Sequence, residues 1–313
     1  MKLKILFPCD YFDHKIADEA YRSEYEIAKS LGFECLLFDY DDFLETKKLN
    51  IRRNLNNEID YDIIVYRGWM LKVDDYFFLD GHLSDLGYNL INPTFLYETF
   101  HHFDEIYYYI KNIVDTPKTV IISFDNGWNL FNPDIEFLPL NLKEQFTPLN
   151  LKEQFTDYFI MKDNVKSVKG TDFPTKISTG ISDEELTKLV EKFKEYRGNL
   201  FTGEILLKQY VDLKKYGETT NEWRAFYFLE KVMTVSRNSN QPENCPVVPD
   251  ELINNTHLTG LSSMFYTIDF AEKEDGSWIL IETGDGQVSG LCPNQNILEF
   301  YTKIQNYWNE KYK

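Results

Sequence analysis

Cysteines are few in this 313-residue chain, and the four present lie far apart: Cys9, Cys35, Cys245 and Cys292. They show no C-x-x-C spacing, which is typical of free thiols in a reducing compartment. Long apolar runs are missing too. The run within MKLKILFPCD is too short for a signal peptide, and no run reaches the length of a membrane-spanning helix. We therefore expect a soluble cytoplasmic protein without a membrane partner.

Positive charge is also scarce. The chain has 33 Lys and Arg residues but 51 Asp and Glu residues, and the formal net charge is −18. Such a field repels the phosphate backbone, so nonspecific nucleic-acid binding is not expected. A small polyanion could still bind through a local basic cluster. The hydrophobic content of 43% and the aromatic content of 16% indicate a globular chain, long enough for two or three subdomains.

The most informative stretch covers residues 265–291. Two apolar, alternating runs flank Asp275-Gly276, a dipeptide typical of a two-residue hairpin turn. Counting outward from that turn places Asp269 directly opposite Glu282. Opposed carboxylates repel each other unless one is protonated or a cation lies between them, and Mg²⁺ prefers such oxygen ligands. The alternative is a solvent-facing hairpin with incidental acids. The other face would present Ile268, Phe270, Ile279 and Ile281 to a core.

The first 93 residues alternate between strands and helices. Short apolar strands are expected at 3–7, 34–39, 60–67 and 87–92, which predicts a small α/β unit with a parallel sheet. Ligands collect at the carboxyl ends of such strands, and Arg67 is the last residue of the third one. Arg67 is equally well explained as a surface ion pair.

The middle of the chain carries lysines on strands. Lys118 opens one strand, Lys162 ends another at 158–162, and Lys208 lies inside an otherwise apolar strand at 205–211. A polar loop with Ser167 and Lys169 follows Lys162. A buried lysine is costly unless it meets an anion, although each lysine alone can extend to solvent. Residues 93–115 are expected to be helical, with the adjacent His101 and His102 as ordinary helix residues.

Residues 139–147 and 148–156 are identical, PLNLKEQFT in each case. Two units are too few for a solenoid, and Pro148 would interrupt a continuous helix. We interpret one copy as a surface insertion without a chemical role.

A second hairpin is expected in NEWRAFYFLEKVMTVSRN, turning at Leu229-Glu230 or Glu230-Lys231. A two-residue turn would place Arg224 on the same face as Arg237. Two arginines there need an acid or an anion between them, and Glu222 or a phosphate would serve. The alternative is a structural ion-pair network.

These parts occur in an order that resembles the ATP-grasp superfamily, and most closely its clade named for an arginine and two lysines. The stretches that carry the resemblance are YRGWML (66–71), LIN (90–92), TPK (116–118), MKDNVKSVKG (161–170), EWRAF (222–226) and IETGDGQVSGL (281–291). The resemblance covers the whole chain. It implies a preATP-grasp α/β domain at 1–93 and a two-lobed α+β ATP-grasp fold, with one lobe at 94–207, including the duplicated insertion at 139–156, and the other at 208–313.

The resemblance also implies roles for individual residues. ATP would contact Lys118 and Lys162 through its phosphates and the backbone of Gln209, Tyr210 and Val211 through its adenine, with Lys208 alongside. The usual glycine-rich phosphate loop is replaced by VKSVKG, where Ser167 and Lys169 would act as donors. Other implied roles are Mg²⁺ ligation by Asp269, Glu282 and Asp285, steadying of the transferred phosphoryl group by Arg224 and Arg237, and substrate contacts from Arg67, Gln287 and Ser289.

The implied activity is an ATP- and Mg²⁺-dependent ligase that joins a carboxylate to an amine or thiol through an acylphosphate. The carboxylate and amine would belong to small molecules or a peptide. Two alternatives stay open: a kinase of the same fold that phosphorylates a hydroxyl, and a non-catalytic nucleotide-binding component of a larger complex. The lysine, arginine and carboxylate set favours an enzyme, because phosphoryl transfer depends on positioning and charge neutralisation.

Overall fold

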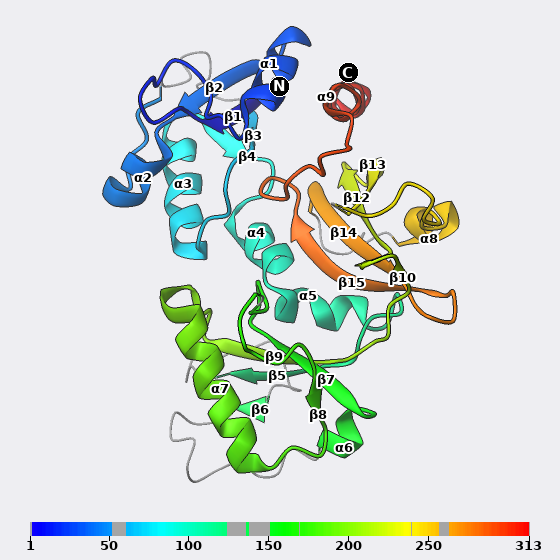
Figure 1. Cartoon of the computed structure of the whole chain (residues 1–313). Coiled ribbons are helices and arrows are strands. Elements are labelled where there is room, and N and C mark those ends of the chain that lie inside the picture. The colour runs from blue at the N-terminus through cyan, green and yellow to red at the C-terminus, as the bar shows by residue number, and fades with distance from the viewer. Residues whose placement is uncertain are drawn as a thin grey trace.

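The computed structural model describes residues 2–51, 61–123, 136–137, 151–168, 170–238, 240–256 and 263–312. Figure 1 shows an N-terminal α/β unit in blue and cyan, a middle lobe mostly in green, and a C-terminal lobe in yellow to red. The helices α4 (Thr94–His101) and α5 (Phe103–Ile110) lie between these parts. The expected architecture, an α/β unit followed by two lobes, is confirmed.

The N-terminal unit is a parallel sheet in the order β2–β1–β3–β4. Every residue of β1 is buried, as in parallel strands that are covered on both faces. The strands and helices predicted here are confirmed. The bounds are β1 (Leu3–Pro8), α1 (Arg22–Ser30), β2 (Glu34–Phe38), α2 (Tyr40–Thr46), β3 (Asp62–Tyr66), α3 (Val73–Asp85) and β4 (Tyr88–Leu90).

The segment expected to be helical throughout 93–115 is broken at His102, whose backbone is extended (φ −98°, ψ 111°). The break lets the Phe103 N–H bond to the Asn164 carbonyl at 3.1 Å instead of to its own helix. The two histidines are therefore not ordinary residues of one helix. His101 ends α4 and stacks on Tyr97, with ring centroids 4.9 Å apart, and His102 precedes α5.

The middle lobe is a sheet in the order β6–β5–β9–β7–β8, with β9 antiparallel to both β5 and β7. A helix starts at Ser182, where Ser182 and Glu185 form the capping box that their S-x-x-E spacing in the sequence predicts. Its buried face packs on the sheet. The bounds are β5 (Thr119–Ser123), β6 (Glu136–Phe137), α6 (Leu151–Gln154), β7 (Tyr158–Lys162), β8 (Ile177–Ser178), α7 (Asp183–Arg197), η1 (Gly198–Leu200) and β9 (Glu204–Gln209).

The second copy of the nine-residue repeat is partly in the core of this lobe. Leu151 and Phe155 are 6% and 3% exposed, and they belong to the same apolar cluster as Phe159 of β7. The first copy, 139–147, lies outside the described residues. The second copy is therefore not a surface insertion throughout, because two of its apolar side chains are buried.

The C-terminal lobe is an antiparallel sheet in the order β13–β12–β14–β15. The last helix, α9, packs Phe300 against Phe226 of this sheet, and both belong to a cluster that includes Ile5 of β1. The N-terminal unit and this lobe thus share an apolar core. The bounds are β10 (Lys215–Tyr216), β11 (Thr219–Thr220), β12 (Glu222–Phe228), β13 (Lys231–Arg237), α8 (Asp250–Asn255), β14 (Phe265–Glu272), β15 (Trp278–Asp285) and α9 (Ile297–Lys311).

The hairpin of β14 and β15 pairs Asp269 with Glu282, as predicted. The turn and the strand pairing that produce this register differ from the prediction. The turn has three residues rather than two, because Lys273 donates to the Ser277 carbonyl at 2.7 Å across 274–276. The register then shifts by one residue between Asp269 and Phe270, leaving Ile281 as the extra residue of a β-bulge. As a result Leu280, rather than Ile281, faces Phe270 in the core.

The hairpin of β12 and β13 turns at Leu229-Glu230, one of the two predicted positions, with both residues at positive φ (51° and 65°). A register shift next to Tyr227 leaves an extra residue in β13. The prediction that Arg224 and Arg237 share a face is therefore wrong. Arg224 lies opposite Ser236, and Arg237 lies opposite Trp223 on the other face.

Candidate active site

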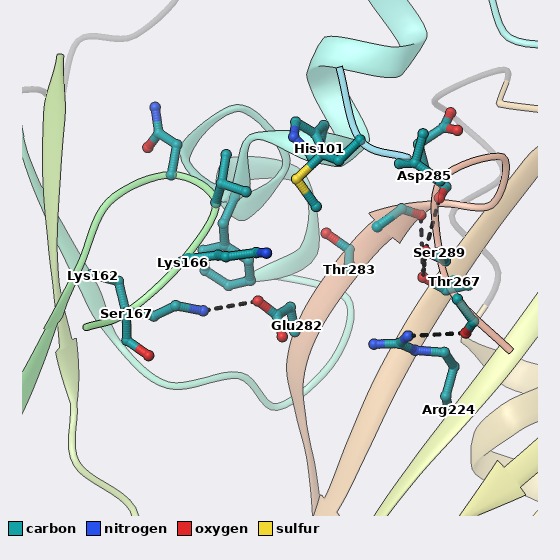
Figure 2. A pocket seen from close by; sticks show the side chains of 17 residues that line it. His101, Lys162, Lys166, Ser167, Arg224, Thr267, Glu282, Thr283, Asp285 and Ser289 are labelled. Atoms are coloured by element: carbon teal, nitrogen blue, oxygen red, sulfur yellow. Dashed lines mark hydrogen bonds and ion pairs between the residues drawn. The ribbon is translucent and has the colours of Figure 1, made fainter. Parts of the chain in front are cut away.

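A cavity of about 530 Å³ opens between the middle and C-terminal lobes. The side chains around it come from β7 and the loop after it, from β12 and β15, and from the α4–α5 junction (Figure 2). The polar residues that line it are His101, Lys162, Asn164, Lys166, Ser167, Arg224, Thr267, Glu282, Thr283, Asp285 and Ser289. Segments far apart in the sequence thus converge on one chamber with several charged groups.

A row of charged side chains crosses the C-terminal sheet at this cavity. Arg224, Asp269 and Glu282 are register partners on the neighbouring strands β12, β14 and β15. The Arg224 guanidinium binds both Asp269 carboxylate oxygens, at 2.8 and 2.7 Å, and this bidentate geometry is the strong form of the interaction. The predicted opposition of two carboxylates is confirmed, and each carboxylate has a cation of its own beside it.

The cation beside Glu282 is Lys162, which reaches across from β7 of the other lobe. Its Nζ lies 2.9 Å from the Glu282 Oε1 (Figure 2). Burial raises the pKa of the Glu282 carboxyl, but the Lys162 charge and hydrogen bond outweigh it, and the pKa falls to about 2. Glu282 is therefore an anion at any physiological pH, which suits a metal ligand.

Lys208 lies behind this pair and is 3% exposed. Its Nζ donates to the carbonyl of Ile281, the bulged residue, at 2.9 Å, and lies 3.5 Å from the centre of the Phe103 ring. Burial, and then the nearby Lys162 charge, lower the pKa of Lys208 well below its ordinary value. The β-bulge thus turns a strand carbonyl toward a buried amine near the Lys162–Glu282 pair.

The loop after β7 is held in shape by Asp163, which is fully buried. Its Oδ1 accepts from the backbone N–H groups of Val165 and Lys166, at 2.9 and 2.6 Å, and its Oδ2 accepts from Arg197 at 2.5 Å. This shape places Lys166 and Ser167 along the cavity wall. Lys169, predicted as a phosphate donor, lies outside the described residues.

The loop after β15 is fixed from behind by Arg67, which is 1% exposed. Arg67 binds both Glu24 carboxylate oxygens, at 3.0 and 3.1 Å, and its Nη1 donates to the carbonyls of Gly286, Gln287 and Ser289. The structure therefore places Arg67 as a support of this loop, away from the cavity lining.

Two further predicted residues belong to the same support. Asp285 accepts hydrogen bonds from the Asn92 Nδ2 at 2.6 Å and from the Gln287 N–H at 2.9 Å. The Gln287 side chain is fully buried, accepts from the Tyr66 N–H and donates to the Tyr76 hydroxyl. Burial raises the pKa of Asp285 to about 7 despite these bonds. Both oxygens of Asp285 thus have donors inside the protein, although the residue borders the cavity.

Of the remaining predicted residues, one reaches the cavity and the others do not. The Ser289 hydroxyl reaches the cavity and lies 3.0 Å from the Thr267 hydroxyl (Figure 2). Lys118 is exposed, and Arg237 pairs with Glu243 at 2.9 Å. The segment 209–211 joins β9 to the C-terminal lobe, with the Tyr210 N–H bonded to the Tyr158 carbonyl at 3.0 Å. None of these last three belongs to the described lining of the cavity.

Sequence reasoning missed several polar groups at the cavity. Thr283 follows Glu282 in β15, and its buried hydroxyl has no hydrogen-bond partner among the described residues. The same holds for the Oδ1 of Asn164. His101 also lines the cavity, and burial lowers its pKa to about 3, so the imidazole is neutral. Only the position of Thr283, on the same strand as a predicted metal ligand, offered a sequence signal.

The donor set at the cavity fits Mg²⁺ in company with a phosphate. Glu282 lines the cavity, Asp269 is its register partner on the same face of the sheet, and the unpartnered Thr283 hydroxyl also belongs to the cavity lining. Mg²⁺ takes oxygen ligands and is held by one or two carboxylates plus phosphate oxygens. Lys162 and Arg224, which neutralise these carboxylates here, have the charge and geometry for phosphate binding.

A comparison with protein-family models matches residues 147–306, slightly more than half of the chain, to the ATP-grasp domain of R2K clade family 3. The chain belongs to this ATP-grasp family. ATP with Mg²⁺ is accordingly its cofactor pair, and the cavity between the ATP-grasp lobes contains the residues suited to them. No curated protein sequence matches the chain.

Solved structures support the ATP-grasp fold over nearly the whole chain. A D-cycloserine synthetase, DcsG, superposes with a TM-score of 0.56 at 11% identity, covering 98% of this chain and 99% of that one. The ATP-grasp ligase PsnB, solved with a minimal precursor, Mg and ADP, gives 0.56 at 10% identity, covering 97% of each chain. A RimK-domain ATP-grasp protein from Sphaerobacter thermophilus gives 0.53 at 9% identity, covering 97% and 98%. At these identities the likeness establishes the fold alone.

Among the described residues, no helix combines the length and apolar character required to cross a bilayer.

Proposed function

We propose that the protein is an ATP- and Mg²⁺-dependent ligase that joins a carboxylate to an amine, with a small molecule or a peptide as substrate. The observation that carries the proposal is the charged row of Arg224, Asp269 and Glu282, met by Lys162 from the facing lobe. Two cations and one carboxylate line one cavity, with Asp269 next to them in the sheet, and together they supply what phosphoryl transfer to a carboxylate requires. The ligase character of PsnB and of the D-cycloserine synthetase, which share the fold, supports the same reaction class.

Each residue has a distinct task in this proposal. Lys162 would bind phosphate oxygens of ATP and in doing so release Glu282, which with Asp269 would hold Mg²⁺. The ion would supply charge neutralisation at the phosphates. Arg224, with the Gly290 carbonyl 3.4 Å from its Nη1, lies next to the loop after β15 at the cavity and would steady the phosphoryl group. Ser289 and Thr267 offer hydroxyls to the carboxylate substrate.

The reaction balances in two steps. A carboxylate oxygen attacks the γ-phosphorus, the bond from that phosphorus to its bridging oxygen breaks, and ADP leaves. The amine then attacks the acyl carbon, phosphate departs with the former carboxylate oxygen, and the amine loses a proton. Neutral His101 and the apolar Val165 and Met70 border the cavity, which favours the exclusion of water from the activated carboxylate.

Space for the substrates is present next to the nucleotide cavity. A second cavity of about 450 Å³ shares Met70, His101, Val165 and Lys166 with the first. It extends between residues 70–74 of the N-terminal unit and residues 197–202 of the middle lobe. We propose that the carboxylate or its acceptor enters through this second cavity.

The test uses ¹⁸O-labelled carboxylates and a panel of amines with the full-length protein. The proposal expects ADP and phosphate, with one ¹⁸O transferred from the carboxylate to phosphate. Arg224→Ala should abolish this transfer, whereas Arg237→Ala, a matched arginine on the opposite face of β12–β13, should retain it. AMP and pyrophosphate as products, or a stable phosphorylated hydroxyl compound without free phosphate, would contradict the ligase assignment.

A further inference from the structure

A cysteine, a histidine and an aspartate converge at the carboxyl edge of the N-terminal sheet, away from the nucleotide cavity. Cys9 follows β1, Asp39 follows β2, and His14 lies in the loop between β1 and α1, drawn in dark blue in Figure 1. Their ligand atoms all lie within 4.8 Å of one another. No other group of three His, Cys, Asp or Glu side chains with metal-ligand spacing occurs among the described residues.

The backbone presents these three side chains in a fixed manner. Cys9 forms an isolated bridge with Ala17, which closes the loop that carries His14. Within the loop, the Asp10 carboxylate accepts from the N–H groups of Phe12 and Asp13, at 2.9 and 3.1 Å. Asp39 is the N-cap of α2 through its Oδ1, which accepts from the Asp42 N–H at 2.9 Å. Its Oδ2 stays directed at His14 Nε2, 3.2 Å away.

We propose that Cys9, His14 and Asp39 bind a zinc ion, with a fourth position left to water or another ligand. Sulfur and imidazole ligands are unsuited to Mg²⁺ and suit Zn²⁺, which takes Cys, His and carboxylate ligands in a tetrahedral arrangement. In such an arrangement ligand atoms lie about 3.3–3.8 Å apart. The His14 and Asp39 ligand atoms already lie 3.2 Å apart, and the Cys9 sulfur lies within 4.8 Å of both. A small movement of the His14 side chain, which is 60% exposed, would complete the arrangement.

Charge supports the same assignment. A thiolate at Cys9 and the carboxylate of Asp39 carry two negative charges, and a divalent cation with neutral His14 balances both. Zinc displaces the thiol proton on binding. The bound ion would fix the loop that carries Tyr11 and Phe12, which are 67% and 92% exposed.

The experiment titrates the full-length protein, freed of metal by chelation and carrying no histidine tag, with Zn²⁺ in a calorimeter. Excess Mg²⁺ occupies the oxygen-ligand site. One Zn²⁺ per chain is expected, with affinity lowered at least about tenfold in His14→Ala and in Cys9→Ser. His82→Ala and Cys292→Ser are matched controls that should bind as the wild type does. His14 is exposed, so its replacement leaves the fold intact.

Cobalt gives an independent readout. Co²⁺ in the same site should show a thiolate-to-metal charge-transfer absorption that Cys9→Ser removes and Cys292→Ser retains. The proposal is overturned by the absence of saturable Zn²⁺ binding, by unchanged affinity in His14→Ala, or by a Co²⁺ spectrum without a sulfur contribution.

Discussion

The Lys162 Nζ donates to the Glu282 Oε1 at 2.9 Å, and this ion pair joins the middle lobe to the C-terminal lobe across the cavity. In the proposed function both partners have a second use, because the amine attracts phosphate and the carboxylate attracts the metal. On that proposal, the nucleotide and Mg²⁺ would separate the lysine from the glutamate when they bind.

Glu282→Gln should abolish the Mg²⁺ dependence of ATP binding while leaving the fold unchanged. The amide retains the size of the side chain but lacks the negative charge that holds the metal and Lys162. Calorimetric titration of ATP with and without Mg²⁺ measures the effect, and Glu243→Gln, in the exposed pair with Arg237, is the matched control. A Glu282→Gln protein that still binds ATP more tightly with Mg²⁺ would contradict the assignment of Glu282 as a metal ligand.

Lys208→Met should leave the ligand-free protein as stable as before, or more stable by about 1–2 kcal/mol, because a buried amine is replaced by an apolar chain of similar length. The stabilisation by ATP and Mg²⁺ should become smaller, because the phosphates lose a nearby cation. Urea unfolding with and without nucleotide gives both quantities. The exposed Lys118→Met should change ligand-free stability by less than about 0.5 kcal/mol. If ATP and Mg²⁺ stabilised Lys208→Met as much as they stabilise the wild type, Lys208 would not interact with the bound nucleotide.

Arg67→Ala should cost about 3–5 kcal/mol, because it leaves the buried Glu24 carboxylate without its cation. Chemical denaturation measures this loss, and soluble yield reports it if the variant fails to fold. Tyr301→Phe, which removes one hydrogen bond to Glu24, should cost about 1 kcal/mol. The partly exposed Arg22→Ala, from the pair with Asp10, should cost less than about 1 kcal/mol. Wild-type stability in Arg67→Ala would instead favour the substrate contact predicted from the sequence.

Asp285 should make stability depend on pH. Its folded pKa of about 7 lies above the ordinary value of 3.8, so the folded state keeps a proton that the unfolded state has lost. Stability is therefore lost as pH rises from about 4 to 7. Relative to Asp285→Asn, the wild type should lose about 2–3 kcal/mol between pH 5 and pH 8. Urea unfolding across this range measures the difference, and a constant difference would mean that Asp285 is ionised throughout.

Deletion of one copy of PLNLKEQFT should preserve the fold. The copies are identical, so the shortened chain still has a leucine and a phenylalanine to take the buried places of Leu151 and Phe155. In the shortened chain, replacement of that phenylalanine by alanine should cost about 3–5 kcal/mol. Thermal unfolding of both variants provides the measurement. Loss of soluble protein on deletion alone would show that both copies are structural.

Local patterns predicted much of the fold because they were strong. The capping box at Ser182, the alternation of strands and helices before Pro93 and the apolar strand around Lys208 each correspond to an observed element. The prediction that Asp269 lies opposite Glu282 was also correct, although it assumed a two-residue turn and no bulge. The longer turn and the bulge at Ile281 shift the register in opposite directions and cancel.

The failures come from features without a local sequence signal. The bulge in β13 moved Arg237 to the wrong face for a partnership with Arg224, and bulges depend on what packs around the strand. The buried support built from Arg67, Asp285 and Gln287 depends on the contact between the N-terminal unit and the C-terminal lobe. From the sequence alone such residues are expected at the surface or in a ligand-binding site, because charged residues are seldom fully buried.

The three-residue turn and the bulged strand of the β14–β15 hairpin depend on each other. Removing one residue from the turn while keeping the bulge would shift the register of the two strands by one residue and place Glu282 on the apolar face of the sheet. Removing both together would restore the alignment but withdraw the free carbonyl that Lys208 uses. Insertions and deletions in this hairpin are therefore expected to be inherited as a matched pair, and chains that lost both should have lost the buried lysine as well.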